Sequence, residues 1–171
     1  MLCLNNTRAL LALLAAARVL PPRRGNSAAA RGVWLDMETN LEGGCLCGAV
    51  RYSVSGPALD TGSCHCRTCR RASSAPELPF AQFATSAFAI TRGYPARYRS
   101  SPEVVRTFCR TCGSPLTWQH NGRPDRLDIM TCSLDDPDRL PPAYRVWTSH
   151  KPSWAVIGDD LPAYATTRPA V

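Results

Sequence analysis

Lysine is almost absent from this chain of 171 residues, because 19 of the 20 basic residues are arginine and Lys151 is the exception. Arginine pairs with carboxylates and phosphates through a planar fork, so the composition suits anionic partners, although a biased coding sequence would give the same preference. Stripes of basic residues interleaved with aromatic ones, typical of nucleic-acid-binding domains, are also lacking. Residues 37–171 carry 15 basic and 12 acidic residues. We therefore expect no nucleic-acid partner.

Long apolar runs are lacking as well. The run ALLALLAAA near the N-terminus ends at Arg18 and is too short to span a bilayer. Residues 1–36 could be a secretory signal, an organelle-import leader, or an extension upstream of a true start at Met37. We favour the last interpretation and predict one domain over residues 37–171, a cytoplasmic location and no membrane partner. The sequence leaves the oligomeric state open, a homodimer included.

A sustained helical stripe of apolar residues is missing from the domain. Val50, Tyr52 and Val54 alternate with polar residues, which is typical of a half-buried strand. Turn-forming glycine and proline separate further short runs. These observations predict an all-β fold, with a short helical turn after Cys69, and strands at Phe80–Thr91, Tyr94–Arg99, Val104–Cys109, Pro115–His120, Leu127–Ser133 and Tyr144–Thr148.

Nine cysteines are present, an odd number, and seven of them fall into C-x-C, C-x-C-x-x-C and C-x-x-C clusters. Disulfide frameworks belong mainly to small secreted domains that lack a core, whereas this chain is long enough to bury one. Clustered cysteines in a chain of this size favour metal thiolates.

Two pairs of cysteines predict a closed, structural zinc site. Cys45 and Cys47 supply two thiolates, and Cys109 and Cys112 supply two more, which completes a tetrahedron. Gly113 follows at a point where a turn around a metal often needs a positive φ. A redox dithiol would instead be followed by a helix, but strand-like residues follow here.

The segment CHCRTCRR predicts a second, open zinc site with Cys64, Cys66 and Cys69 as ligands and as catalytic residues. On an extended chain Cys64 and Cys66 point to one face and His65 to the other, so His65 is a poor fourth ligand. Cys132 is more typical of a small core residue. Three protein ligands and one open position are typical of catalytic zinc.

Three arginines flank this second cluster and are candidate substrate-binding residues. Cations near a zinc with three thiolates would lower the basicity of the sulfurs. They could also bind the carboxylates of an anionic thiol, although arginine is common on protein surfaces. The three are Arg67, Arg70 and Arg71. We expect the tryptophans Trp118, Trp147 and Trp154 to be core residues or pocket walls.

Five motifs occur in a fixed order along residues 43–164: GGCLCGAVRYSVSG, SCHCRTCRRASSAP, YRSSPEVVRTFCRTCGSPLTW, SLDDP and KPSWAVIGDDLPAY. In these motifs the chain resembles the glutathione-dependent formaldehyde-activating enzyme family, which includes centromere protein V. The resemblance implies an all-β, tent-like fold of short antiparallel sheets held together by zinc. It implies a structural zinc at Cys45, Cys47, Cys109 and Cys112 and an active-site zinc at Cys64, Cys66 and Cys69.

The chain departs from the family pattern at three positions that are not proposed ligands. Ser74 and Cys132 stand where glycine is common, and Arg145 stands where histidine is common. We expect Cys132 and Arg145 to face the site and to influence the choice of substrate.

The resemblance implies a zinc-dependent carbon–sulfur lyase-type enzyme that acts on thiol–aldehyde adducts, with glutathione and formaldehyde as the small-molecule partners. A non-catalytic zinc module that carries thiols or binds a protein or nucleic acid is the competing hypothesis. The family's link to centromere protein V keeps that hypothesis open.

Overall fold

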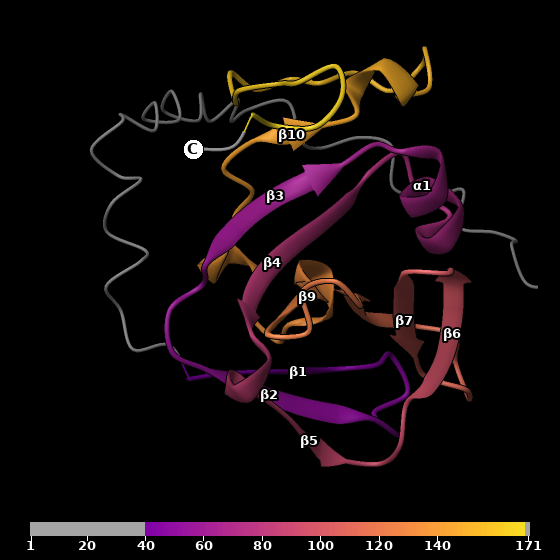
Figure 1. The fold of residues 1–171 in the computed structure, drawn as a ribbon, viewed down its shortest axis with the longest axis vertical. Coiled ribbons are helices and arrows are strands. Elements are labelled where there is room, and N and C mark those ends of the chain that lie inside the picture. Colours follow the sequence, from indigo (N-terminus) through magenta and orange to yellow (C-terminus); the bar gives the residue numbers. More distant parts are fainter. Residues whose placement is uncertain (1–39, 170–171) are drawn as a thin grey trace, which may run out of the picture.

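The computed structural model describes residues 40–169, in which two β-sheets pack against each other (Figure 1). Residues 1–36, interpreted above as a leader, lie outside the described residues, so that interpretation stays a prediction. The elements in chain order are β1 (Asn40–Gly44), β2 (Arg51–Ser55), β3 (Asp60–Cys64), α1 (Arg67–Ser73), β4 (Leu78–Ala84), β5 (Phe88–Arg92), β6 (Ala96–Ser101), β7 (Val104–Phe108), β8 (Pro115–His120), β9 (Arg126–Met130) and β10 (Arg145–Val146), with short 3₁₀ turns at Thr85–Ala87, Thr131–Ser133, Pro137–Arg139 and Thr148–His150.

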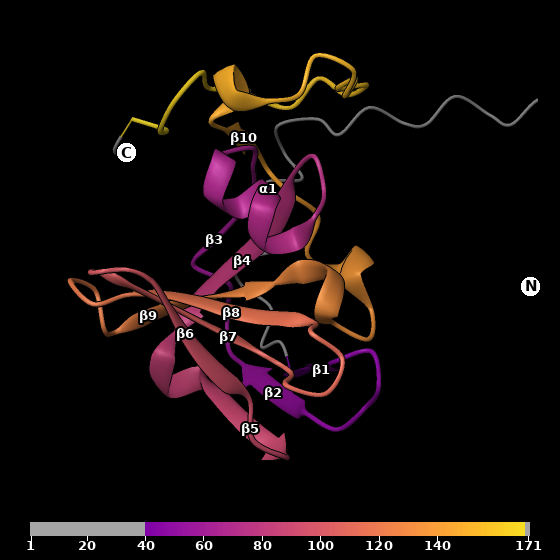
Figure 2. The same ribbon diagram turned by 90° about the vertical axis from the view of Figure 1, so that its right-hand side faces the viewer.

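The predicted all-β architecture is confirmed. One sheet has three strands in the order β1-β2-β5, and the other has seven in the order β10-β3-β4-β9-β8-β7-β6. Neighbouring strands are antiparallel, with one exception: the two-residue strand β10 runs parallel to the end of β3. In Figure 2 the three-stranded sheet lies below strands β6 to β9 of the larger sheet, and α1 and the C-terminal segment lie above those four strands.

The hydrophobic core lies between the two sheets. Tyr52 and Val54 alternate along β2 and face inward, as their period-two spacing predicts. Phe83 on β4 and Ile129 on β9 come from the opposite sheet and are fully buried in the same cluster. Gly43 permits the close approach of β1, because a side chain there would meet the Tyr52 ring and the carbonyl of Ser133.

The other face of the seven-stranded sheet carries the side chains that alternate with the core residues. Asp128 on β9 lies opposite Gln82 on β4 and Trp118 on β8, and Trp118 lies opposite Arg106 on β7. Because cross-strand partners point to the same face of a sheet, these four residues form one row above the core. We call them the cross-strand row.

The C-terminal segment holds a loop above this face. The backbone amides of Arg145 and Trp147 donate to the carbonyls of Pro162 and Thr166. Trp147 has a φ of 57° and a ψ of 36°, a left-handed conformation that a bulky residue seldom adopts. The surrounding hydrogen bonds therefore fix Trp147 in an unfavourable backbone conformation over the sheet.

The strand predicted at Phe80–Thr91 is wrong in one respect, because it is two strands in different sheets. A 3₁₀ turn at Thr85–Ala87 ends β4 and directs β5 into the three-stranded sheet. The predicted strands at Val104–Cys109 and Pro115–His120 match β7 and β8 closely. Within residues 40–169 no helix is both long enough and apolar enough to cross a membrane.

Candidate metal centres and the adjoining cavities

The first cysteine cluster joins two hairpin turns from different sheets. Cys45 and Cys47 lie in the turn between β1 and β2, and Cys109 and Cys112 lie in the turn between β7 and β8. The four sulfurs all lie within 4.8 Å of one another. Gly113 has a φ of +77°, as predicted for the turn after Cys112.

Backbone and hydroxyl donors orient the sulfurs of this cluster. The Val50 amide donates to the Cys45 sulfur at 3.2 Å, and the Ser114 hydroxyl lies 3.3 Å from the Cys112 sulfur. The Ser114 hydrogen bond holds the pKa of the Cys112 thiol down at about 5. Four converging sulfurs, one with a stabilised thiolate, are a donor set that fits a four-coordinate metal ion. This cluster could hold a metal that links the two sheets.

The second cluster lies where β3 meets α1. Cys64 ends β3, Cys66 is the N-cap of α1 and Cys69 lies in its first turn, so the strand-to-helix turn brings the three sulfurs within 4.8 Å of one another. The amide of Cys69 donates to the Cys66 sulfur at 3.3 Å. The hydrogen bond from Cys64 lowers the pKa of the Cys66 thiol to about 2, with a further contribution from Cys69. The same interaction with Cys66 raises the pKa of Cys64.

Three sulfurs this close together are a donor set that one cation could contact at the same time. The described residues bring no fourth cysteine, histidine or carboxylate into this group. Its donor set fits a metal ion that keeps one position for another ligand. The two clusters therefore differ as predicted, one closed by four sulfurs and one with three.

The three-cysteine cluster forms part of the wall of a cavity of about 340 Å³. The other walls are largely apolar, and Trp118 and Trp147 are among them, as predicted; Trp154 is instead exposed. The polar lining includes Asp128 and Arg106 of the cross-strand row. We call this space the thiol cavity.

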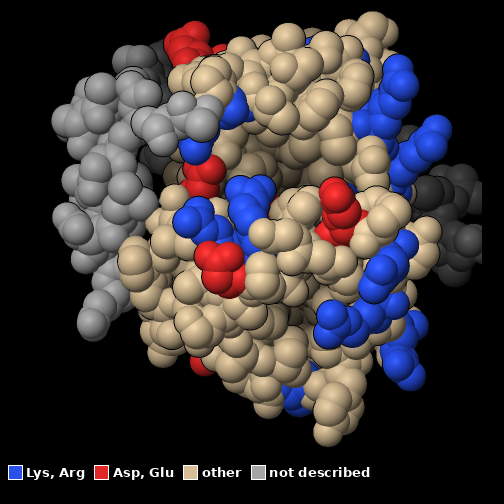
Figure 3. Space-filling model, in the orientation of Figure 1, with Lys and Arg blue, Asp and Glu red and all other residues tan. Residues whose placement is uncertain are grey.

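A second cavity of about 500 Å³ adjoins the thiol cavity and shares Thr68, Ser100, Arg106 and Met130 with it. Arg67 and Arg71 line this second space, which we call the arginine cavity. Basic side chains gather on the side of the molecule where α1 and β6 lie (Figure 3). Arg70 lines neither cavity, because its Nε donates to the His65 carbonyl at 3.2 Å.

His65 lies outside both clusters, as its place between Cys64 and Cys66 predicted. Its side chain is buried, with Nδ1 3.1 Å from the Pro76 carbonyl and Nε2 3.5 Å from the Glu77 carboxylate. Nε2 has no hydrogen-bond partner, so the imidazole is only half satisfied.

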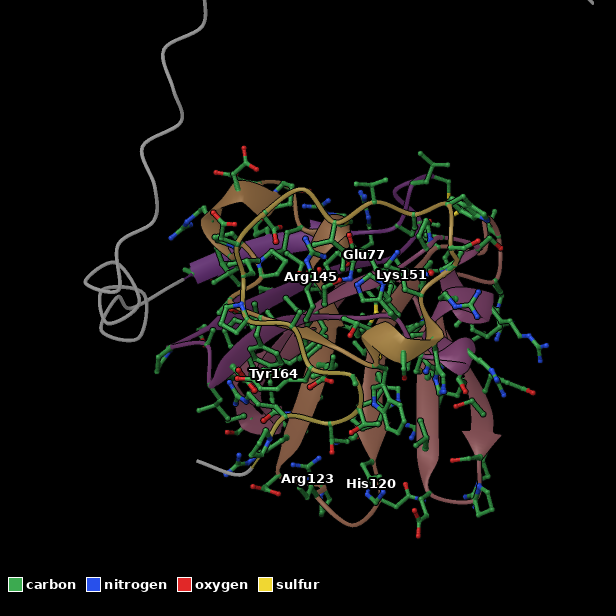
Figure 4. All side chains as sticks on the ribbon, turned by 90° about the horizontal axis from the view of Figure 1, so that it is seen from above. Glu77, His120, Arg123, Arg145, Lys151 and Tyr164 are labelled. Carbon is green, nitrogen blue, oxygen red and sulfur yellow. The ribbon has the colours of Figure 1, made fainter. Side chains whose placement is uncertain are left out.

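The expectation that Arg145 and Cys132 face the site is wrong. Arg145 is buried between Glu77 and Asp159 and lines neither cavity (Figure 4). The Asp159 carboxylate raises the pKa of Arg145 and keeps it charged. Cys132 is exposed in the turn after β9 and is not a core residue either. Arg145 is instead linked to the strand that carries Cys64, because its partner Glu77 also accepts a hydrogen bond from Ser63 at the end of β3.

Sequence reasoning missed Arg106 and Asp128. Arg106 Nη2 lies 3.6 Å from the Cys69 sulfur, and it lines both cavities. Burial raises the pKa of Asp128 to about 6, against lowering contributions from the Gln82 hydrogen bond and the Arg123 charge. Each of the two is a charged residue inside a predicted strand, which was the available signal. Their places on either side of Trp118 depend on the register of three strands, which a local pattern does not give.

The chain is similar to a described protein family and to two individual proteins. The family model of the glutathione-dependent formaldehyde-activating enzyme matches residues 40–150, which is more than half of the chain. The chain belongs to this family. An uncharacterized lyase of Schizosaccharomyces pombe is 31% identical over 83 residues, which are 48% of this chain and 60% of that protein. A crystal structure of a Rhodobacter sphaeroides protein is 27% identical, with a TM-score of 0.48, and the match covers 56% of this chain and 88% of that one.

Proposed function

We propose that this chain is a zinc-dependent carbon–sulfur lyase-type enzyme that cleaves or forms the adduct between an anionic thiol, such as glutathione, and an aldehyde, such as formaldehyde. Zinc would be held structurally at the four-cysteine cluster and catalytically at Cys64, Cys66 and Cys69. The observation that carries the proposal is the location of the three-cysteine cluster in the wall of the thiol cavity, whereas no cysteine of the other cluster lines either cavity.

Zinc bound at the three-cysteine cluster would supply a Lewis acid with one free position, suited to a thiolate or to the oxygen of an aldehyde. The protein's own residues orient the reactants around that position. The largely apolar walls of the thiol cavity would surround the reacting carbon, and a one-carbon aldehyde needs little of its volume. Arg106 stabilises negative charge beside Cys69.

The arginine cavity supports an anionic thiol as the substrate. Arg67 and Arg71 from α1 and Arg106 from β7 line one space. Guanidinium groups bind carboxylates through paired hydrogen bonds. Because the two cavities share four residues, a thiol in the first can extend a carboxylate into the second. Arg70, bound to the His65 carbonyl, is assigned no such role.

The thiol–aldehyde adduct also forms without a catalyst, so its appearance alone would not show enzyme activity. The test therefore measures how fast adduct and free reactants interconvert at equilibrium. Zinc-loaded full-length protein is added to glutathione and ¹³C-formaldehyde, and the rate of interconversion between adduct and free reactants is measured by NMR exchange spectroscopy. We expect acceleration over the spontaneous rate, and loss of that acceleration in Cys66→Ser. Equal spontaneous and protein-containing rates with both zinc ions present would refute the proposal.

The anionic part of the proposal has its own test. Arg67→Gln combined with Arg71→Gln is expected to raise the KM for glutathione while leaving the KM for cysteamine, a thiol without a carboxylate, unchanged. Arg110→Gln is the matched control, because Arg110 is exposed in the β7–β8 turn and lines neither cavity. Equal effects on the two thiols would remove the arginine cavity from substrate binding.

A further inference from the structure

Asp128 is a carboxylate in a largely apolar wall. It lies at the centre of the cross-strand row, between Gln82 and Trp118, and reaches the thiol cavity together with Phe80 and Met130. Its Oδ1 accepts a hydrogen bond from Gln82 Nε2 at 3.0 Å. Within residues 40–169 it has no ion pair within 4.0 Å and no other side-chain hydrogen bond.

This environment costs the protein stability. Ionised carboxylates are costly to bury without a paired charge, and an apolar residue at this place on the sheet would avoid that cost. Groups that are kept ionisable in such a place are candidates for function, above all when they line a cavity beside other reactive groups. A purely structural role is poorly supported, because a single amide hydrogen bond is all that Asp128 provides.

The charges around Asp128 suit a group that exchanges protons near neutral pH. Arg106 and Arg123 favour its ionised form, whereas Asp60, two strands away on β3, and burial favour its neutral form. Burial is the largest of these contributions, so the pKa is raised to about 6. General acids and bases act best when their pKa lies near the working pH.

We propose that Asp128 is the catalytic acid–base residue of the thiol cavity, an inference that rests on the proposed function. In the cleavage direction its carboxylate takes the proton from the hydroxyl of the adduct. The electrons of that O–H bond form the carbonyl, the carbon–sulfur bond breaks, and its electron pair leaves with the sulfur as a thiolate. In the opposite direction the thiolate attacks the carbonyl carbon, and the neutral carboxyl group of Asp128 returns the proton to the oxygen.

Arg106 interacts both with the cysteine cluster, where the thiolate leaves, and with Asp128, which takes the proton. It lies beside the Cys69 sulfur and also interacts electrostatically with Asp128. The thiolate therefore departs on the side of Arg106, while the hydroxyl proton is received on the side of Asp128. Among the described residues, the lining of the thiol cavity includes no other acidic residue and no histidine, so Asp128 is the fixed carboxylate there that can accept the proton.

Asp128→Asn tests the assignment, because asparagine keeps the shape and the acceptor for Gln82 but cannot take a proton. Asp125→Asn is the matched control, an exposed carboxylate in the turn just before the same strand. For zinc-loaded wild type, the exchange rate is expected to fall on the acidic side with an apparent pKa of about 6. In Asp128→Asn we expect kcat to fall by about 100-fold or more and KM to change little. The fall of the exchange rate at acidic pH, which we call the acidic limb, should be absent. Asp125→Asn should match the wild type, and Asp128→Glu should recover part of the rate.

A second readout does not depend on activity. ¹³C NMR of the carboxyl carbons should show one aspartate that titrates near pH 6 in the wild type and is missing in Asp128→Asn, with glutathione binding and two zinc ions per chain retained. If the wild type is active and Asp128→Asn has the same rate and the same fall in rate at acidic pH, this inference alone is overturned. A zinc-loaded wild type without activity would overturn the proposed function and this inference with it.

Discussion

Replacing Asp128 by asparagine should stabilise the folded protein, by an amount that depends on pH. The folded-state pKa of Asp128 is about 6 against an ordinary value of 3.8. One pKa unit corresponds to about 1.4 kcal/mol, so the ionised carboxylate costs the folded state about 3 kcal/mol at full effect. Because the folded-state pKa is raised, this cost is absent below pH 3.8, grows as the pH rises towards 6, and is constant above about pH 7.

The variant should therefore exceed the wild type in free energy of unfolding by about 1.5 kcal/mol at pH 5 and by about 3 kcal/mol at pH 8. The assay is urea unfolding of both zinc-loaded proteins at pH 5, 6, 7 and 8, a range above the acid conditions that remove zinc from thiolates. Asp125→Asn again serves as the control, with no pH-dependent difference expected. A difference between Asp128→Asn and wild type that is constant over this range, or that reverses, would refute the reasoning from burial.

Two further predictions concern the scaffold. Cys109→Ser should fail to fold or lose both the closed metal site and most of its stability, because a structural zinc contributes roughly 10–16 kcal/mol of apparent binding free energy; an unchanged melting temperature would contradict this. Ser74→Gly should raise the free energy of unfolding by about 1 kcal/mol in denaturant titrations, because Ser74 caps α1 with a φ of 53°, where an L-residue with a Cβ is disfavoured. An equal loss of stability would show that the Ser74 side chain makes a compensating contact.

The partition of the cysteines could be predicted because it depends on local spacing. A pair in one turn offers two sulfurs to one metal, so Cys45 with Cys47 and Cys109 with Cys112 could be matched without a fold. The helical turn was predicted after Cys69, but α1 begins earlier, at Arg67, and contains Cys69. Pro115–His120 was predicted with its bounds correct, because Gly113 and Gly122 delimit a clear alternation.

The features that the sequence could not predict depend on residues far apart in the chain or on turns that lack glycine and proline. β3, with the sequence DTGSC, has no apolar alternation and was missed, although it carries Cys64. The break between β4 and β5 has neither glycine nor proline. The placement of Asp128 and Arg106 on one face of the sheet, with Trp118 between them, requires the register of three strands, which no local pattern encodes. Arg145 appeared to be a site residue until its partners Glu77 and Asp159 were known.

The claim that CHCRTCRR is an open, reactive metal centre while the other cluster is a closed structural one is tested most directly by metal removal. A mild chelator is added to the zinc-loaded protein, and zinc release, circular dichroism and adduct exchange are followed together. The account predicts rapid loss of about one of two zinc ions, an unchanged fold, loss of exchange activity, and recovery of that activity when zinc is returned. Release of both ions together with unfolding, or activity that persists after the first ion leaves, would contradict it.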